Sequence, residues 1–189
     1  MAYKRTFIAI KIPLTEELTK VIGVLKNTLH ASKIYWINEN YSHITLNFLG
    51  NTSPEQIETV KKVIGNISKK HKVSEFELTG LGVFKHNGRP AVIWAGTKNY
   101  DGLIALQKEM ALHLEASGFL LEKREFRPHL TLGRIKTQSD KVQLNTVLSE
   151  YKNIPLGTAH VDCIHYFESI LKQEGPEYKL ISSEKLSES

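Results

Sequence analysis

Two short stretches, His43-Ile44-Thr45-Leu46 and His129-Leu130-Thr131-Leu132, repeat one pattern of histidine, apolar residue, threonine and apolar residue. On a β-strand, residues two apart share a face, so the histidine and threonine of each stretch point one way and the two apolar residues point the other. Each stretch therefore predicts a strand that is anchored in a core by one face and presents an imidazole and a hydroxyl on the other. The separation of 86 residues (129 − 43 = 86) predicts two related lobes with one motif each.

The spacing of apolar residues elsewhere predicts helices and strands around both motifs. Ser53, Pro54 and Gln56 form a capping box that marks one helix start, and Gly118 suits a left-handed helix stop. The class is α+β or mixed α/β. The expected helices cover residues 15–30, 54–67, 101–118 and 140–151, and the expected strands cover residues 4–12, 34–37, 42–49, 76–84, 91–95, 126–132, 161–167 and 178–181.

Length and composition are those of an ordinary globular protein. The 189 residues, 41% hydrophobic and 24% charged, suffice for one domain with a substantial core. We expect that domain to span residues 1–183 and a disordered tail to cover residues 184–189. No apolar run approaches the roughly 20 residues that a membrane helix needs, so no membrane association is expected.

The net charge of +5 and a pI near 9.2 favour an anionic partner. Lysine and arginine are scattered, however, so charge alone is a weak indication of nucleic acid. The single cysteine, Cys163, cannot form an internal disulfide, which is compatible with a reducing cytoplasm. No histidine or cysteine cluster has metal-ligand spacing and no glycine-rich phosphate loop is present, so neither a metal nor a cofactor is expected.

Two imidazoles that face one phosphate can carry out phosphodiester chemistry without a metal. With an ordinary pKa of about 6.5, one imidazole can take a proton from water while the other gives one to the leaving oxygen. The hydroxyls of Thr45 and Thr131 can donate hydrogen bonds to the non-bridging oxygens, where negative charge develops. Roughly 0.09 copies of the pattern are expected by chance in a chain of this composition, so its repetition is informative.

The doubled motif resembles the two-histidine phosphoesterase superfamily, and its surroundings are similar to the RNA 2',3'-cyclic phosphodiesterases, also named 2'-5' RNA ligases. The resemblance covers most of the chain. Its four matching segments, in order, are residues 5–10 followed by Pro13, residues 43–50, residues 80–84 and residues 127–134.

The resemblance implies an α+β fold with two pseudo-symmetric lobes, whose antiparallel sheets line a central cleft and whose helices pack outside. It implies hydrolysis of RNA 2',3'-cyclic phosphate ends or nucleotides to 2'-phosphomonoesters, with reverse 2'-5' ligation as a second capacity. The resemblance makes His43 the proton donor and His129 the proton acceptor. The residues alone do not show which histidine has which role. Thr45, Thr131 and Arg134 become the phosphate-binding residues. A cytoplasmic monomer without an obligate protein partner is expected.

Strict alternation would place Arg134 on the face of Leu130 and Leu132, so its phosphate role requires the strand to end or bulge at Gly133. The same alternation places Phe48 on the face of Ile44 and Leu46, and we expect both Phe7 and Phe48 to pack in the core instead of stacking on a base. Two other functions stay open: a protein that binds RNA or nucleotides without catalysis, and a phosphodiesterase for 2'-5' oligonucleotides or small cyclic nucleotides.

Overall fold

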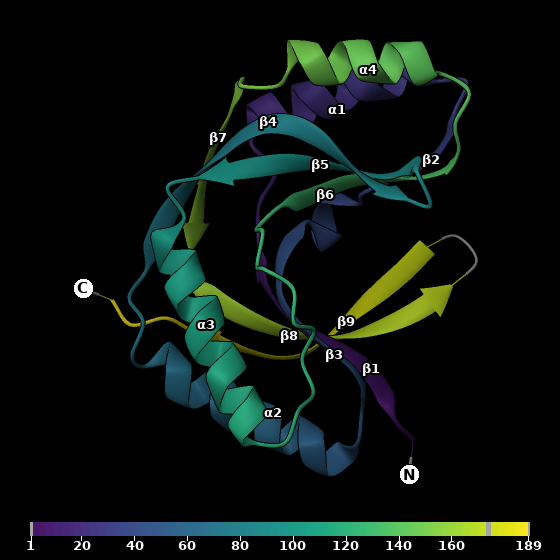
Figure 1. Ribbon diagram of the computed structural model, residues 1–189. Coiled ribbons are helices and arrows are strands. Elements are labelled where there is room, and N and C mark those ends of the chain that lie inside the picture. Colours follow the sequence, from purple (N-terminus) through teal and green to yellow (C-terminus); the bar gives the residue numbers. More distant parts are fainter. Residues whose placement is uncertain (1, 173–174, 189) are drawn as a thin grey trace.

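The computed structural model describes residues 2–172 and 175–188, which form two antiparallel sheets with helices on their outer sides (Figure 1). The first sheet has the strand order β3-β1-β8-β9. Its strands are β1 (Lys4–Lys11), β3 (His43–Thr52), β8 (Cys163–Lys172) and β9 (Gly175–Lys185). The second sheet has the order β2-β6-β5-β4-β7. Its strands are β2 (Lys33–Trp36), β4 (Ser74–His86), β5 (Arg89–Lys98), β6 (Leu130–Thr137) and β7 (Pro155–Val161).

The helices divide between the two sheets, two to each, within the described residues. Helices α2 (Pro54–Ser68) and α3 (Asp101–Ala116) pack against each other beside the first sheet. Helices α1 (Glu16–Thr28) and α4 (Lys141–Glu150) lie together beyond the second sheet, at the top of Figure 1. A single turn of 3₁₀ helix, η1 (Glu39–Tyr41), precedes β3. The predicted α+β architecture of two antiparallel sheets with outer helices is confirmed.

The helix starts follow the sequence signals closely. Ser53 accepts a hydrogen bond from the backbone of Gln56, whose side chain accepts one from the backbone of Ser53, so the predicted capping box is present. Thr15 caps α1 in the same way through the backbone N–H of Leu18. Gly118 takes a positive φ of 89° just beyond α3, as predicted for a left-handed stop.

The chain passes repeatedly between the two sheets, so neither lobe is a continuous segment. After β1 in the first sheet it forms β2 in the second, returns for β3, and crosses again for β4 and β5. The first motif consequently lies on β3 of the first sheet. The second lies at the start of β6 in the second sheet. Each lobe therefore carries one motif, but the lobes are not the two halves of the sequence.

The predicted disordered tail over residues 184–189 is wrong for the part that the structure describes. Strand β9 continues to Lys185, and Leu186 is buried in the main core with only 5% of its surface exposed. The backbone N–H of Ser187 donates to the carbonyls of Ser68 and His71, which ties the tail to the end of α2. One apolar residue among polar neighbours was too short a signal to reveal this docking. Ser189 lies outside the described residues.

Candidate active site

Both motif strands show the predicted alternation between a buried and an accessible face. Ile44, Leu46, Leu130 and Leu132 are buried, while His43, Thr45, His129 and Thr131 are partly accessible. His129 itself stands one residue before β6, because the strand predicted over residues 126–132 begins only at Leu130. The apolar residues hold each strand in the core, and the polar pair faces inward between the sheets.

Each motif ends in a β-bulge, and the extra residue is the last of its four. On β3, Ala9 lies opposite Thr45 and Ile8 lies opposite Asn47, which leaves Leu46 as the additional residue. On β6, Trp94 lies opposite Thr131 and Ile93 lies opposite Gly133, which leaves Leu132 as the additional residue. A bulge of one residue reverses the alternation beyond it. The residue five positions after each histidine is therefore returned to the histidine face.

The second bulge puts Arg134 on the same face of the strand as His129. A phosphate role for Arg134 requires the strand to end or bulge at Gly133, and the extra residue is Leu132, one position earlier. Arg134 is exposed, and its positive charge acts on both His43 and His129. A guanidinium in this position can bind a phosphate that lies between the two imidazoles.

Phe48 is placed on the histidine face by the first bulge, so the prediction that it packs in the core is wrong. It is 49% exposed, and its ring centroid lies 5.7 Å from that of Phe7. Phe7 is buried as predicted, but on the inner side of the first sheet. Its ring centroid lies 5.1 Å from the imidazole of His43. Phe48 therefore offers an exposed aromatic surface beside the site.

The two imidazoles are oriented by the same kind of hydrogen bond. Nδ1 of His43 lies 2.6 Å from the carbonyl oxygen of Tyr41, and Nδ1 of His129 lies 2.8 Å from that of Arg127. Because a carbonyl oxygen can only accept, each Nδ1 carries a proton and donates it. Each Nε2 is thereby left to take or give the proton of a reaction.

The structure brings the two motifs together. Strands β3 and β6 contact each other although they belong to different sheets. Burial is the main cause that lowers the pKa of His43, to about 4, and the charges of Arg134 and His129 lower it further. Burial is also the main cause that lowers the pKa of His129, and Arg134 adds to this shift. Because His129 acts on the protonation of His43, and Arg134 acts on both, the two imidazoles lie close enough to act on one substrate group.

Thr45 and Thr131 flank the imidazoles with free hydroxyls. Each stands two residues after its histidine on the same face, opposite Ala9 and Trp94 respectively. Within residues 2–172 and 175–188, neither hydroxyl makes a hydrogen bond to the protein. Both are available to donate to a ligand oxygen.

Aromatic side chains from other strands enclose the site, and they are not among the residues predicted from the sequence. On the first sheet, Tyr178 of β9 lies edge-on to His43, with ring centroids 5.1 Å apart at 89°. On the second sheet, Phe84 of β4 lies edge-on to His129 at 4.7 Å and 87°. Phe84 ends the matching segment of residues 80–84, to which no role was assigned, and Tyr178 lies in no motif. The position of each ring depends on how distant strands pair. The two orienting carbonyls had no sequence signal either, since every residue has one.

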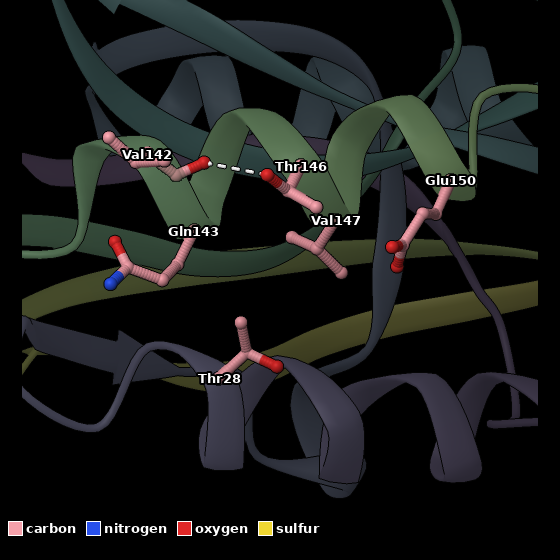
Figure 2. Close-up of a pocket in the computed structure, with 6 residues that line it drawn as sticks. All are labelled: Thr28, Val142, Gln143, Thr146, Val147 and Glu150. Atoms are coloured by element: carbon pink, nitrogen blue, oxygen red, sulfur yellow. Dashed lines mark hydrogen bonds between the residues drawn. The ribbon is translucent and has the colours of Figure 1, made fainter.

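Neither of two cavities in the described part of the chain is lined by a motif histidine. The smaller, about 320 Å³, lies between α1 and α4, where Figure 2 shows Thr28 facing Gln143 and Val147; no motif residue lines it. The larger, about 640 Å³, is lined by Lys11, His165 and Thr158, among others. Lys11 lies opposite His43 across the β1–β3 ladder. Lys11 therefore borders this cavity and is also the ladder neighbour of His43.

Other features of the described residues give no further site. No group of three or more histidine, cysteine, aspartate or glutamate residues in them is arranged to hold a metal ion. No helix among them is long and apolar enough to cross a membrane. The side chain of Arg127, whose role the sequence left open, is bound to Glu125 at 2.8 Å.

Sequence comparisons relate this chain to phosphodiesterases. The family model described as the 2'-5' RNA ligase superfamily matches residues 20–169. A protein of Aeropyrum pernix named RNA 2',3'-cyclic phosphodiesterase is 37% identical over 155 residues, which cover 80% of this chain and 85% of the relative. A protein of the same name from Thermotoga maritima is 32% identical, covering 94% of this chain and 92% of the relative.

Solved structures share the fold. A protein of Thermus thermophilus superimposes with a TM-score of 0.77 at 22% identity, covering 96% of this chain and 97% of that one. Escherichia coli LigT, in a complex with 3'-AMP, superimposes with a TM-score of 0.73 at 22% identity, covering 98% of this chain and 99% of that one. The two-lobed arrangement therefore recurs in proteins of low sequence identity.

Proposed function

Because the chain belongs to the 2'-5' RNA ligase superfamily, we propose that it is an RNA 2',3'-cyclic phosphodiesterase, which opens the cyclic phosphate at an RNA end to a 2'-phosphomonoester. The observation that carries the proposal is the pair of imidazoles on facing strands. Each has Nδ1 bound to a carbonyl and Nε2 free for proton transfer. Histidines that only stabilised the fold would not need this arrangement twice.

In the proposed reaction, Nε2 of His129 takes a proton from water as the water oxygen attacks the phosphorus. The bond between phosphorus and the ribose 3' oxygen breaks, and His43 gives its proton to that oxygen. The product carries a 2'-phosphate and a free 3' hydroxyl. If an RNA 5' hydroxyl takes the place of water, the same two proton transfers form a bond between that 5' oxygen and the phosphorus while the bond to the 3' oxygen breaks, and the product is a 2'-5' phosphodiester. The reverse of this second reaction cleaves a 2'-5' linkage and restores the cyclic phosphate and the 5' hydroxyl.

Three further residues would stabilise the charge that develops on phosphate. The hydroxyls of Thr45 and Thr131 can each donate a hydrogen bond to a non-bridging oxygen, and Arg134 supplies a positive charge at the same place. The exposed ring of Phe48 is suited to stack on the nucleobase of an RNA end. These groups supply binding and electrostatic stabilisation, and the histidines supply proton transfer.

The donor role of His43 depends on the charge of the substrate. In the free protein its pKa is about 4, so the imidazole is neutral at neutral pH. A bound phosphate anion beside it favours the imidazolium and raises that pKa. The substrate would therefore help to protonate the group that later protonates the leaving oxygen.

The pH dependence of kcat/KM should be a bell with its maximum on the acid side of neutral pH. The reaction needs one imidazole protonated and the other neutral, and kcat/KM reports the free protein. The pKa of His43 is lowered to about 4 and that of His129 lies below its ordinary value of 6.5, so the singly protonated pair is most abundant between these values. Initial rates from about pH 4 to about pH 9 at constant ionic strength measure the profile. A kcat/KM that still rises above neutral pH would contradict it.

The function is tested by incubating the protein with an RNA oligonucleotide that ends in a 2',3'-cyclic phosphate, in the presence of EDTA. We expect turnover, with phosphorus NMR identifying a 2'-phosphomonoester as the product. Binding without any product would identify a non-catalytic nucleotide-binding protein instead. Parallel rates on a cyclic mononucleotide and on a 2'-5'-linked dinucleotide would show whether an RNA end is the preferred substrate.

We further propose that the protein acts in the cytoplasm as a monomer without an obligate partner. The single cysteine supports the location, since nothing in the composition requires an oxidising compartment. The site supports the monomeric state, because both histidines and their orienting carbonyls come from one chain. Light scattering during gel filtration tests the oligomeric state.

A further inference from the structure

Tyr178 belongs to a small aromatic cluster that is separate from the main core. The cluster consists of Phe7, Ala9 and Phe167, with Tyr178 packed against it. It covers the inner face of the first sheet, whereas the main core joins the sheets to their helices. An aromatic layer on the face that carries His43 forms part of the site as well as part of the packing.

The ring of Tyr178 forms one wall around His43. It stands perpendicular to the imidazole, and it also meets Phe7 and Tyr41 edge-on with ring centroids 5.0 Å and 5.4 Å away. These contacts withdraw the imidazole from water, and burial is the largest cause of the low pKa of His43. The ring therefore contributes to the protonation behaviour of the proposed proton donor.

The hydroxyl of Tyr178 reaches a residue of the opposite sheet. Tyr178 lies on β9 of the first sheet, and its phenol lies close enough to Arg134 on β6 of the second sheet for the guanidinium to act on it. Burial raises the pKa of the phenol, while the charges of Arg134 and Arg5 oppose this shift. The phenol stays protonated at neutral pH, so its oxygen can accept a hydrogen bond from the guanidinium and its own proton can still be donated.

We propose that Tyr178 is a positioning residue of the phosphodiesterase reaction, whose hydroxyl holds the Arg134 guanidinium at the phosphate site and whose ring closes the pocket of His43. This inference rests on the proposed function and extends it to a residue of β9. One side chain thereby connects the phosphate-binding residue of one lobe with the proton donor of the other.

Two substitutions separate the roles of the hydroxyl and the ring. Tyr178→Phe keeps the ring, so the low pKa of His43 and the acid limb of the kcat/KM profile should not move. The loss of one hydrogen bond to a charged group should raise KM and weaken 2'-AMP binding by about tenfold, with a much smaller change in kcat. Tyr178→Leu also removes the ring, so the pKa of His43 should rise from about 4 toward its ordinary 6.5, and the acid limb should move to higher pH.

A double-mutant cycle tests whether the hydroxyl acts through Arg134. In an Arg134→Ala background, Tyr178→Phe should cause no further loss of 2'-AMP affinity, because the group that it positions is gone. Tyr151→Phe is the matched control, since it removes the hydroxyl of another half-buried tyrosine, which packs against the main core at the end of α4. It should bind 2'-AMP and turn over substrate like the wild type.

The outcomes distinguish this inference from the proposed function. Titration calorimetry with 2'-AMP needs no turnover, so a wild-type protein that binds 2'-AMP but hydrolyses nothing would contradict the function and leave the Tyr178 comparison valid. Equal 2'-AMP affinity in wild type and Tyr178→Phe, or additive losses in the cycle with Arg134→Ala, would overturn the positioning role. A wild-type protein that binds no 2'-AMP would contradict both.

Discussion

Replacement of His129 with alanine should lower kcat on a 2',3'-cyclic-phosphate RNA by a factor of about 10² to 10⁴, which is the usual contribution of a general acid or base. His43→Ala should have an effect of the same order. The two losses should not multiply, because the histidines act on one proton-transfer sequence and the double variant has little left to lose. Single-turnover rates in EDTA measure the chemical step apart from product release.

The matched control for the histidine variants is His30→Ala, which removes an exposed histidine just beyond the end of α1. Circular dichroism and thermal melting should show that all these variants are folded, since both catalytic imidazoles are partly accessible. Retention of half the wild-type rate by either His43→Ala or His129→Ala would refute the two-histidine mechanism. If the rate falls only in proportion to the fraction of folded protein, the loss is one of structure. The experiment would then be repeated with His129→Asn in place of His129→Ala.

Arg134→Ala should reduce kcat/KM by about 10², the lower end of what loss of one transition-state stabilising group costs. The physical reason is that its charge lies where both histidines sense it, so it also lies where a phosphate between them develops charge. Arg134→Lys should recover only part of the activity, because an ammonium keeps the charge but lacks the two-pronged hydrogen bonding.

Arg134→Ala should also shift the pH profile. The charge of Arg134 lowers the pKa of both histidines, so its removal should raise both values and move the optimum of kcat/KM to higher pH. Arg124→Ala serves as the control, because it removes an exposed arginine whose partner is Glu122. A decrease in activity with an unmoved pH profile would place the Arg134 side chain away from the histidines.

The sequence was sufficient to predict the four helices, most of the strands and the faces of the motif strands, but it missed β7 (Pro155–Val161). Alternation correctly separated Ile44 from His43 and Thr45, and the capping box correctly placed the start of α2. Both rest on short-range rules that hold wherever a regular strand or helix forms. The predicted inward orientation of the catalytic candidates follows from these rules.

Sequence reasoning failed where the backbone departs from regularity or where distant strands meet. Strict alternation placed Phe48 in the core because it could not include the bulge at Leu46. A glycine beside the second bulge gave a hint of its position, whereas Asn47 beside the first gave none. Tyr178 could not be predicted because its approach to His43 depends on the pairing of β9, β8 and β1. These features arise from tertiary structure.

The matched bulges bear on the regiochemistry of the reaction. Two equivalent imidazoles with two equivalent threonines would accept a cyclic phosphate in either orientation and release either isomer of the monophosphate. The fifth residue after each histidine removes that equivalence, because it is the aromatic Phe48 on one strand and the cationic Arg134 on the other. A nucleotide whose base contacts Phe48 and whose phosphate contacts Arg134 can bind in only one orientation. We therefore expect the choice of which ribose oxygen departs to depend on two side chains, Phe48 and Arg134, that transfer no proton.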